Sequence, residues 1–252
     1  MKPLFVNAVG LWSPTYPSAS AWASRQADPA AATPKATLLP PLIRRRASLL
    51  TRAGAEAFAQ AARGGGADLA SVCSVWTSAY GEIATTVDLL EQMRSEPEGL
   101  PWPTRFHASV HNAAAGFLSI ACGNRSFSTS LAGGPKGVAF GLLETVALLE
   151  ERGGEAILVA LDEPPPVPFS PKVAFPTLAV AFHLSQEKRE QSLLRVTEVR
   201  PGSLAARIPE PFAAHPCGAA LLLAEAALAR SPQEVPLSLT GEGDWIAVLD
   251  AA

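Results

Sequence analysis

The sequence is poor in the side chains from which disulfides, metal sites and reactive centres are most often built. It has three cysteines and four histidines among 252 residues. Cys73, Cys122 and Cys217 are odd in number, widely separated and free of any C-x-x-C or Cys–His pairing, so neither a disulfide framework nor a zinc site is expected. Phosphate-loop and G-x-G-x-x-G motifs are also missing. We therefore expect no metal, no cofactor and a reducing, cytoplasmic location.

Charge is scarce as well. Charged residues make up 17% of the chain and apolar residues 48%, whereas roughly a quarter of an ordinary soluble protein is charged. This balance favours a large subunit interface. The net charge of -3 offers no basic field for nucleic acid, and nothing indicates binding to a membrane surface. The first apolar run, residues 4–11, is too short for a signal segment or a membrane span and is predicted to be a strand.

Apolar strands and helices follow one another along the chain. The predicted strands cover residues 4–11, 72–77, 126–131, 155–161, 177–184 and 193–199, with a hairpin over 235–239 and 245–249. Helices are predicted over 20–26, 44–63, 83–94, 135–152 and 217–230, with a further small-residue helix within 106–120. The alternation predicts one α/β domain over residues 1–252, a layered α/β/α fold with a mainly parallel mixed sheet.

The stretch FSTSLAGGPKG, residues 127–137, has the form of a nucleophile elbow. A strand enters a Gly133-Gly134 turn, and Pro135 begins an apolar helix. Enzymes use a tight strand–turn–helix corner of this kind to present a nucleophile. Here neither cysteine nor serine occupies the turn. The sequence therefore predicts the backbone geometry of a nucleophile elbow without the nucleophile.

Two neighbouring motifs carry a resemblance to a known family. Residues 109–116 (SVHNAAAG) and 123–128 (GNRSFS) resemble the segments (I/V)-x-N-x-x-A-G and G-x-R-G-P-S of the N-terminal half of β-ketoacyl synthases, which have a thiolase-like fold. Ser126 and Phe127 depart from the Gly-Pro pair of the second segment. The resemblance is best over residues 1–163, and residues 164–252 diverge.

Extended without a gap, the match places Pro135 where these enzymes carry their catalytic cysteine. The neighbours Gly134 and Lys136 offer no thiol either. The second half of a ketosynthase supplies two histidines and a lysine, and neither His183 nor His215 lies in a matching motif. The resemblance thus implies an inherited elbow and no catalytic residue. His111 precedes Asn112, but that asparagine matches a structural position of the family.

Further segments are similar to the short ketosynthase-like partners of aryl polyene pigment synthases. They are VNAVGLWSP at 6–14, LPP at 39–41 with RRR at 44–46, and SAYGE at 78–82. The resemblance implies a non-catalytic, chain-length-factor-like subunit that heterodimerises with an active β-ketoacyl-acyl-carrier-protein synthase and shapes its acyl tunnel. It would meet the acyl carrier protein through that partner.

The same resemblance implies which residues face the partner. Residues 104–109, expected as a loop, would cross the dimer interface, with Arg105 and Phe106 as candidate gates of the tunnel. The alternative is that Phe106 is core and Arg105 a surface charge. Strand 126–131 would pair with its counterpart across the dimer, so the chain alone is expected to homodimerise or to be poorly soluble. The expected tunnel and interface residues are Arg105, Phe106, His107, Ser109, Asn112, Ser128 and Ser130.

Basic residues could dock the acidic carrier protein. Arg44, Arg45 and Arg46 form one candidate cluster, and Lys136 beside the elbow could meet a phosphopantetheine phosphate. Both sets could equally be solvated surface.

Two rival functions stay open from the sequence. In one, a displaced cysteine, Cys217 or Cys122, carries an acyl group. Cys217 is the stronger candidate, because His215 lies close to it and a helix start could lower the pKa of the thiol. In the other, the chain only stabilises a partner and contacts no substrate.

Overall fold

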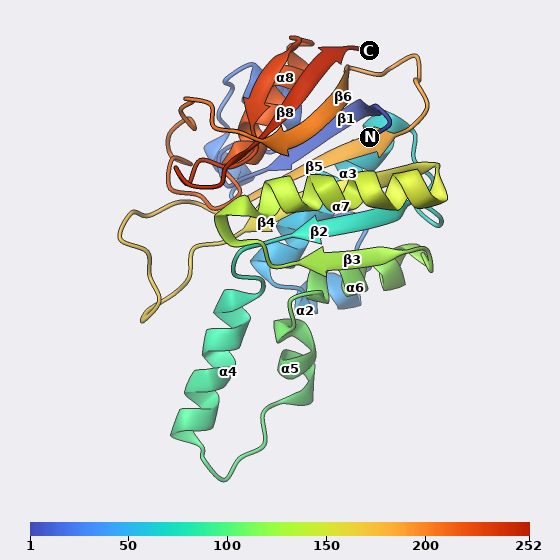
Figure 1. The fold of residues 1–252 in the computed structure, drawn as a ribbon. Coiled ribbons are helices and arrows are strands. Elements are labelled where there is room, and N and C mark those ends of the chain that lie inside the picture. Colours follow the sequence, from blue (N-terminus) through green and yellow to red (C-terminus); the bar gives the residue numbers. More distant parts are fainter.

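The predicted strands join into a single eight-stranded sheet in the computed structural model, which describes all 252 residues (Figure 1). The strand order across the sheet is β3-β2-β4-β5-β1-β6-β8-β7, so β3 and β7 form its edges. The strands are β1 (Leu4–Trp12), β2 (Cys73–Thr77), β3 (Ser128–Leu131), β4 (Glu155–Asp162), β5 (Leu178–Ser185), β6 (Leu194–Pro201), β7 (Gln233–Pro236) and β8 (Trp245–Ala251). Residues beyond 163 supply half of these strands.

Helices cover both faces of the sheet. They are α1 (Ala19–Ala23), the 3-10 turn η1 (Pro29–Ala31), α2 (Pro41–Arg46), α3 (Leu49–Gly65), α4 (Ile83–Ser95), α5 (Pro103–Ser109), α6 (Ala113–Cys122), the 3-10 turn η2 (Gly134–Lys136), α7 (Gly137–Arg152) and α8 (Ala219–Leu228). Helices α3 and α6 share one apolar core with the sheet, and α7 and α8 share the other. Helices α4 and α5 project beyond the β3 edge (Figure 1). No helix is both long enough and apolar enough to span a bilayer.

The sheet is mixed, as predicted, but it is mainly antiparallel. Only β2 with β3 and β2 with β4 run parallel, and the other five pairings are antiparallel. A parallel neighbour needs a crossover connection, usually helical. Helices α4 to α6 supply one between β2 and β3, and α7 supplies another between β3 and β4. No helix lies between β4 and β6, so the expectation of a mainly parallel sheet is wrong there.

Two helical segments differ from the prediction for local reasons. The single helix expected over 44–63 is broken into α2 and α3, because Ala47 is extended and the hydroxyl of Ser48 accepts the backbone N–H of Thr51 at 2.8 Å. That bond is a helix N-cap. The expected loop over 104–109 is helix α5, which begins with Pro103, a residue favoured at a first helical position.

Close contact with β1 fixes the position of α3. A Cβ atom built on Gly10 would lie 1.9 Å from the carbonyl oxygen of Ala57. Ala53, Ala57 and Ala61 are fully buried along the same helix. Glycine on the strand and alanines on the helix therefore let the two backbones touch.

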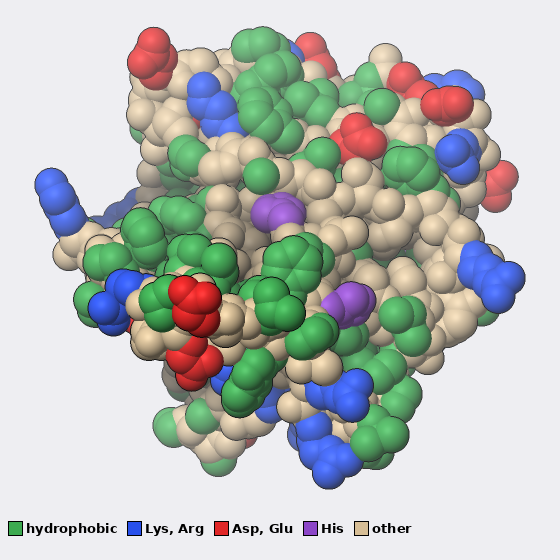
Figure 2. Space-filling view, turned by 90° about the horizontal axis from the view of Figure 1, so that it is seen from below, with side chains coloured by type: hydrophobic (Ala, Val, Ile, Leu, Met, Phe, Trp, Pro, Cys, Tyr) green, Lys and Arg blue, Asp and Glu red, His purple; other side chains and the backbone are tan.

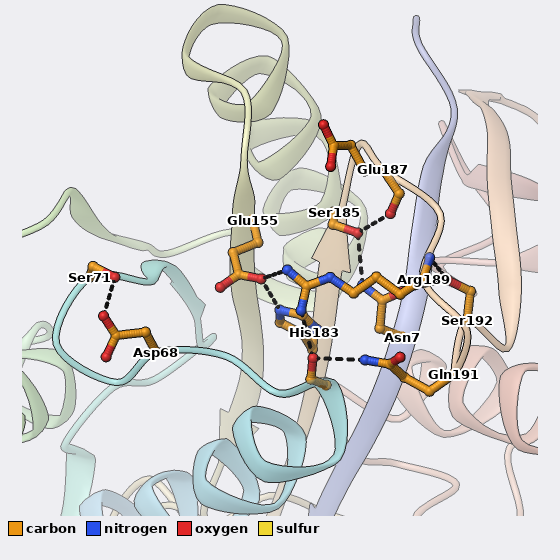
Figure 3. Close-up of polar contacts among 11 residues, drawn as sticks. Asn7, Asp68, Ser71, Glu155, His183, Ser185, Glu187, Arg189, Gln191 and Ser192 are labelled. Atoms are coloured by element: carbon orange, nitrogen blue, oxygen red, sulfur yellow. Dashed lines mark hydrogen bonds and ion pairs between the residues drawn. The ribbon is translucent and has the colours of Figure 1, made fainter.

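The far end of α3 is tied to the sheet by polar side chains (Figure 3). The carbonyl oxygen of Gly65 accepts hydrogen bonds from Arg189 Nη1 at 2.7 Å and Gln191 Nε2 at 3.0 Å. Arg189 also pairs with Glu155, whose Oε2 lies 3.0 Å from His183 Nε2. Burial lowers the pKa of His183. The cluster joins α3, β4, β5 and the turn before β6.

We expect Gly10→Ala to lower the free energy of unfolding by about 2–3 kcal/mol, because the added methyl group has no space against α3. Urea denaturation followed by circular dichroism measures the change. Gly116→Ala is the matched control, since a Cβ atom there meets nothing within 4 Å. In the middle of α6 it should stabilise the chain by roughly 0.5–1 kcal/mol. Equal effects of the two substitutions would contradict this account of the packing.

Candidate functional site

The corner after β3 has the predicted strand–turn–helix form. Gly134 adopts a left-handed conformation with φ of +53°, and a Cβ atom on Gly133 would lie 2.6 Å from Cα of Gly137. Both positions therefore require glycine. Pro135 lies in η2, and α7 begins two residues later. The chain turns as tightly as a nucleophile elbow does.

Pro135 opens onto a cleft of about 370 Å³. The other walls come from residues 206–208 and 213–216, the first residue of α8, and Leu239. His215 and Arg207 are the only ionisable side chains in the lining, and no thiol or hydroxyl is present. Lys136 lies against Gly243, where a Cβ atom would come within 2.9 Å of its Nζ. The lining of this cleft therefore contains neither a cysteine nor a serine nucleophile.

Cys217 lies behind this cleft and is 0% exposed. Its thiol donates to Asp162 Oδ2 at 3.1 Å, and burial raises the pKa of the thiol well above its usual value. His215 Nδ1 accepts the backbone N–H of Cys217 at 3.1 Å, and burial lowers the pKa of this imidazole to about 4. The imidazole is thus not placed to take the thiol proton. The expectation that the helix start would lower the pKa of Cys217 is wrong.

Cys122 is no better suited to acyl transfer. It ends α6, two residues before Asn124, whose side chain donates to the carbonyl oxygens of Leu69 and Val72 at 2.9 Å each. Those contacts place it by the start of β2, at the opposite end of the strand from the elbow. Burial raises the pKa of the Cys122 thiol, which disfavours the nucleophilic thiolate.

Asp162 connects the sheet to the segment that leads into α4. It ends β4 and is fully buried. Its carboxylate accepts the hydroxyl of Ser78 at 2.6 Å, the N–H of Ala79 at 2.9 Å and the N–H of Tyr80 at 3.0 Å. Burial raises the pKa of Asp162, and these donors oppose that rise. The sequence analysis missed this residue, although an acidic side chain directly after an apolar strand is a recognisable signal.

Two more buried acids adjoin Asp162. Glu163 is 6% exposed, and burial raises its pKa to about 7, with the neighbouring charge of Glu82 as a further cause. Glu82 is 3% exposed, and its Oε1 accepts the hydroxyl of Thr51 at 2.6 Å. Burial raises the pKa of Glu82 too. Glu82 belongs to the SAYGE segment, to which the sequence analysis assigned no role.

Three of the seven predicted interface residues, Asn112, Ser128 and Ser130, line one groove. Between α6 and the free edge of β3, this groove has a volume of about 470 Å³. It is lined by His111, Asn112, Ala115, Gly116, Ser119, Ser128, Thr129 and Ser130. A strand edge with unpaired backbone groups is suited to pairing with another chain.

The other four predicted residues lie on α5, and none of them lines that groove. Phe106 is 59% exposed, and His107 is exposed beside it. Arg105 makes an ion pair of 3.0 Å with Asp88 of α4. The hydroxyl of Ser109 donates to the carbonyl oxygen of Phe106 at 2.9 Å. Neither Arg105 nor Phe106 lines the groove.

An apolar patch covers the projection formed by α4 and α5. Figure 2 looks at the molecule from this side, and hydrophobic side chains gather over much of the face. Its exposed large apolar residues are Leu90, Met93, Leu100, Trp102, Phe106 and Val110. Contiguous apolar surface of this kind marks an interaction site.

The predicted basic docking residues lie apart from each other. Arg44, Arg45 and Arg46 form the last turn of α2, where Arg44 Nη1 donates to the carbonyl oxygen of Lys35 at 3.1 Å. None of the three lines the cleft or the groove. Lys136, in contrast, sits at the elbow.

Comparisons with known proteins agree with this geometry. The family model for the β-ketoacyl synthase N-terminal domain matches residues 19–233. A search of curated protein sequences found no match. A solved complex of the ketosynthase ApeO with its chain length factor ApeC, from Xenorhabdus doucetiae, superposes with a TM-score of 0.73 at 20% identity, covering 98% of this chain and 100% of the other.

Two further solved structures show the same similarity of fold. The ishigamide ketosynthase/chain length factor superposes with a TM-score of 0.62 at 17% identity, over 80% of this chain and 68% of the other. The type II polyketide synthase complex AntDE:AntF, an acyl-carrier protein with its hexaketide-bound ketosynthase, gives 0.72 at 12% identity, over 100% and 99%. At these identities the likeness establishes the fold.

We expect Asp162→Asn to lower the free energy of unfolding by about 2–4 kcal/mol, because an amide cannot accept all the donors that converge on the carboxylate. Chemical denaturation measures the loss. Asp250→Asn is the control: its half-exposed carboxylate lies 3.8 Å from Arg195 at the end of β8, and its loss should cost less than about 0.5 kcal/mol. A loss no larger at Asp162 than at Asp250 would show that the buried contacts do not support the fold.

Glu163 should make the fold less stable as the pH rises. Its pKa in the folded chain, about 7, is above the usual 4.5, so folding favours the protonated acid. The contribution of Glu163 to the free energy of unfolding is then fully present below about pH 4.5, and about 3 kcal/mol is lost as the pH rises through 7. Glu163→Gln should remove the part of the pH dependence that comes from Glu163 and leave the variant more stable than the wild type at pH 8, while the raised pKa values of Glu82 and Asp162 remain. Urea unfolding at pH 5 and pH 8 measures both chains, and parallel pH profiles would contradict the assignment.

Proposed function

The chain belongs to the family of β-ketoacyl synthase N-terminal domains and has its thiolase-like fold, and from this premise we propose that it is a non-catalytic, chain-length-factor-like subunit. In this role it forms a heterodimer with an active β-ketoacyl-acyl-carrier-protein synthase and shapes the acyl tunnel of that partner. The products would be polyenes of the aryl polyene type, and the acyl carrier protein would be met through the partner.

The proposal depends chiefly on the corner at Pro135. Condensation needs a nucleophile and a donor for the developing oxyanion. Proline supplies no sulfur, and it also has no backbone N–H that could serve as such a donor. The cleft beside it contains no thiol or hydroxyl, and Cys217 is buried as a thiol. These observations favour an elbow without a catalytic role over a catalytic cysteine at another position in the chain.

Two surfaces of the chain are suited to contact with a partner chain. The free edge of β3 and the groove beside it offer backbone groups and small polar side chains. The apolar patch on α4 and α5 supplies the desolvated area that a stable interface needs. We place the ketosynthase across both surfaces. The ApeO–ApeC complex joins a ketosynthase to its chain length factor, which supports this choice of partner.

Within this heterodimer, α5 would narrow the acyl tunnel. Phe106 is exposed in the free chain and is bulky enough to end a tunnel that the partner completes. Arg105 lies beside it, held by Asp88. One methylene forced against a rigid wall costs on the order of 1–3 kcal/mol, so such a side chain sets chain length by its volume. The arginines of α2 and Lys136 would assist carrier-protein docking.

Co-expression with a ketosynthase of this class should yield a heterodimer whose product length depends on α5. Replacing Phe106 and Arg105 by alanine should lengthen the products, because the tunnel gains depth, and mass spectrometry of the products measures the shift. Phe169→Ala is the matched control, since Phe169 is 57% exposed on the loop before β5. That variant should leave the product distribution unchanged.

Two outcomes of this experiment would reject the proposal. An unchanged product distribution after both α5 substitutions would leave only a stabilising role. An acyl adduct on Cys217 or Cys122, found in the intact mass of this subunit after incubation with acyl-carrier substrate, would instead identify it as an acyltransferase.

A further inference from the structure

A small inner cavity adjoins the groove beside β3. It has a volume of about 10 Å³, on the order of a single water molecule. The cavity and the groove share His111, Ala115 and Ser130, so these three residues form the wall between them. Apolar walls are provided by Leu50, Trp76, Ala114 and Leu161.

Three of the residues that line this cavity carry a polar atom without a partner. Oε2 of Glu82 and Oγ of Ser130 are both buried without a hydrogen bond, and so is Oγ1 of Thr77. The Thr77 hydroxyl lies toward α7, because a Cβ atom on Gly137 would come within 2.6 Å of it. Glu82 is held by Thr51 through its other oxygen. Ser130 lies opposite Trp76 in the parallel pairing of β2 and β3, and both side chains line the cavity. A buried polar atom without a partner destabilises the fold, so native proteins seldom keep several of them together.

The chemistry of these atoms defines a complementary ligand. Burial raises the pKa of Glu82, which shifts its carboxyl group toward the protonated form, and in that form Oε2 can donate a hydrogen bond. The Ser130 hydroxyl can donate or accept. One ligand oxygen that accepts a hydrogen bond from Oε2 of Glu82 and forms a second hydrogen bond with Oγ of Ser130 would satisfy both atoms. A methyl group of similar size would leave both atoms unpaired.

We propose that this cavity binds the far end of the acyl chain, and that it selects chains whose end carries a hydroxyl or carbonyl oxygen over chains with a plain alkyl end. The inference rests on the proposed function, because the groove that adjoins the cavity belongs to the surface on which we place the ketosynthase. Glu82 and Ser130 are then specificity-determining residues. His111, whose Nε2 lies 3.3 Å from the carbonyl oxygen of Ser78, stands at the entrance.

The test compares pantetheine thioesters in matched pairs across a range of lengths. In each pair one acyl chain ends in a hydroxyl and the other in a methyl group, with equal numbers of heavy atoms. Isothermal titration calorimetry with the purified heterodimer should show, at the length that reaches the cavity, a hydroxyl preference of about tenfold, as one buried hydrogen bond gives. Equal affinities at every length would overturn the proposal.

Variants assign the preference to the cavity. Glu82→Gln keeps a donor at this position and should keep the preference, whereas Glu82→Leu should abolish it. Glu163→Gln is the matched control, since it changes a neighbouring buried acid that does not line the cavity, and it should keep the preference. If Glu82→Leu does not fold, Ser130→Ala removes the other atom and should weaken the preference. Persistence of the full preference in the folded Glu82→Leu or Ser130→Ala variant would overturn the assignment.

The two proposals can fail separately. A heterodimer that forms and whose product length responds to Phe106, but that shows no hydroxyl preference, overturns only the inference about the cavity. If no ketosynthase co-purifies, the proposed function fails. The same titrations are then made with this chain alone, where a hydroxyl preference lost in Glu82→Leu supports the cavity and its absence overturns it.

Discussion

The carboxylate of Asp162 is the contact on which the candidate site depends. It stands at the end of β4, where it accepts from Ser78, Ala79 and Tyr80 and also from the thiol of Cys217. It therefore joins three segments that are distant in sequence. The segment after β2 is held in place to start α4, and the loop before α8 is held behind the elbow. A buried carboxylate is costly unless its oxygens are paired, and here several donors compensate for its burial.

Proline at the elbow is compatible with the fold and provides no nucleophilic side chain. Pro135 lies in the first turn of a helix, where an N–H has no intrahelical partner and the fixed φ angle of proline is suitable. The glycines of the turn are still required by the close approach of Gly133 to Gly137. The corner thus keeps its shape, which sets the position of β3 at the edge of the sheet and the start of α7. Under the proposed function this shape has a use independent of catalysis, because β3 and its groove form an exposed edge that can meet the partner.

Buried acidic residues lie beside this corner, and their burial destabilises the fold. Glu82, Asp162 and Glu163 are all nearly inaccessible to solvent, and burial raises the pKa of each. Asp162 is compensated by its donors, whereas Glu82 and Glu163 each keep one oxygen without a partner. Exceptions to the rule that buried polar groups are paired tend to fall at functional sites. Their position between the elbow and the groove is consistent with that tendency.

Local sequence determined most of the elements and the form of the elbow. Apolar runs such as EAILVALD are buried strands, and Gly133-Gly134-Pro135 encodes a turn followed by a helix start, because these residues restrict the backbone directly. The missing thiol at the elbow was likewise visible in the sequence. Two local features differ from the prediction. The helix is broken between α2 and α3 by the N-cap at Ser48, and residues 103–109 form helix α5, which begins with Pro103.

Only the tertiary structure decided which residues meet. The sheet is mainly antiparallel because β5 and β6 enter it on opposite sides of β1, which no local pattern specifies. His111 and Asn112 share a groove with Ser128 and Ser130, whereas Phe106, close to them in sequence, does not line it. Cys217 stands near an imidazole, yet its burial raises the thiol pKa that its helix start was expected to lower. Pairing of strands, burial and hydrogen bonding between distant segments are properties of the packed chain, so sequence spacing alone could not determine them.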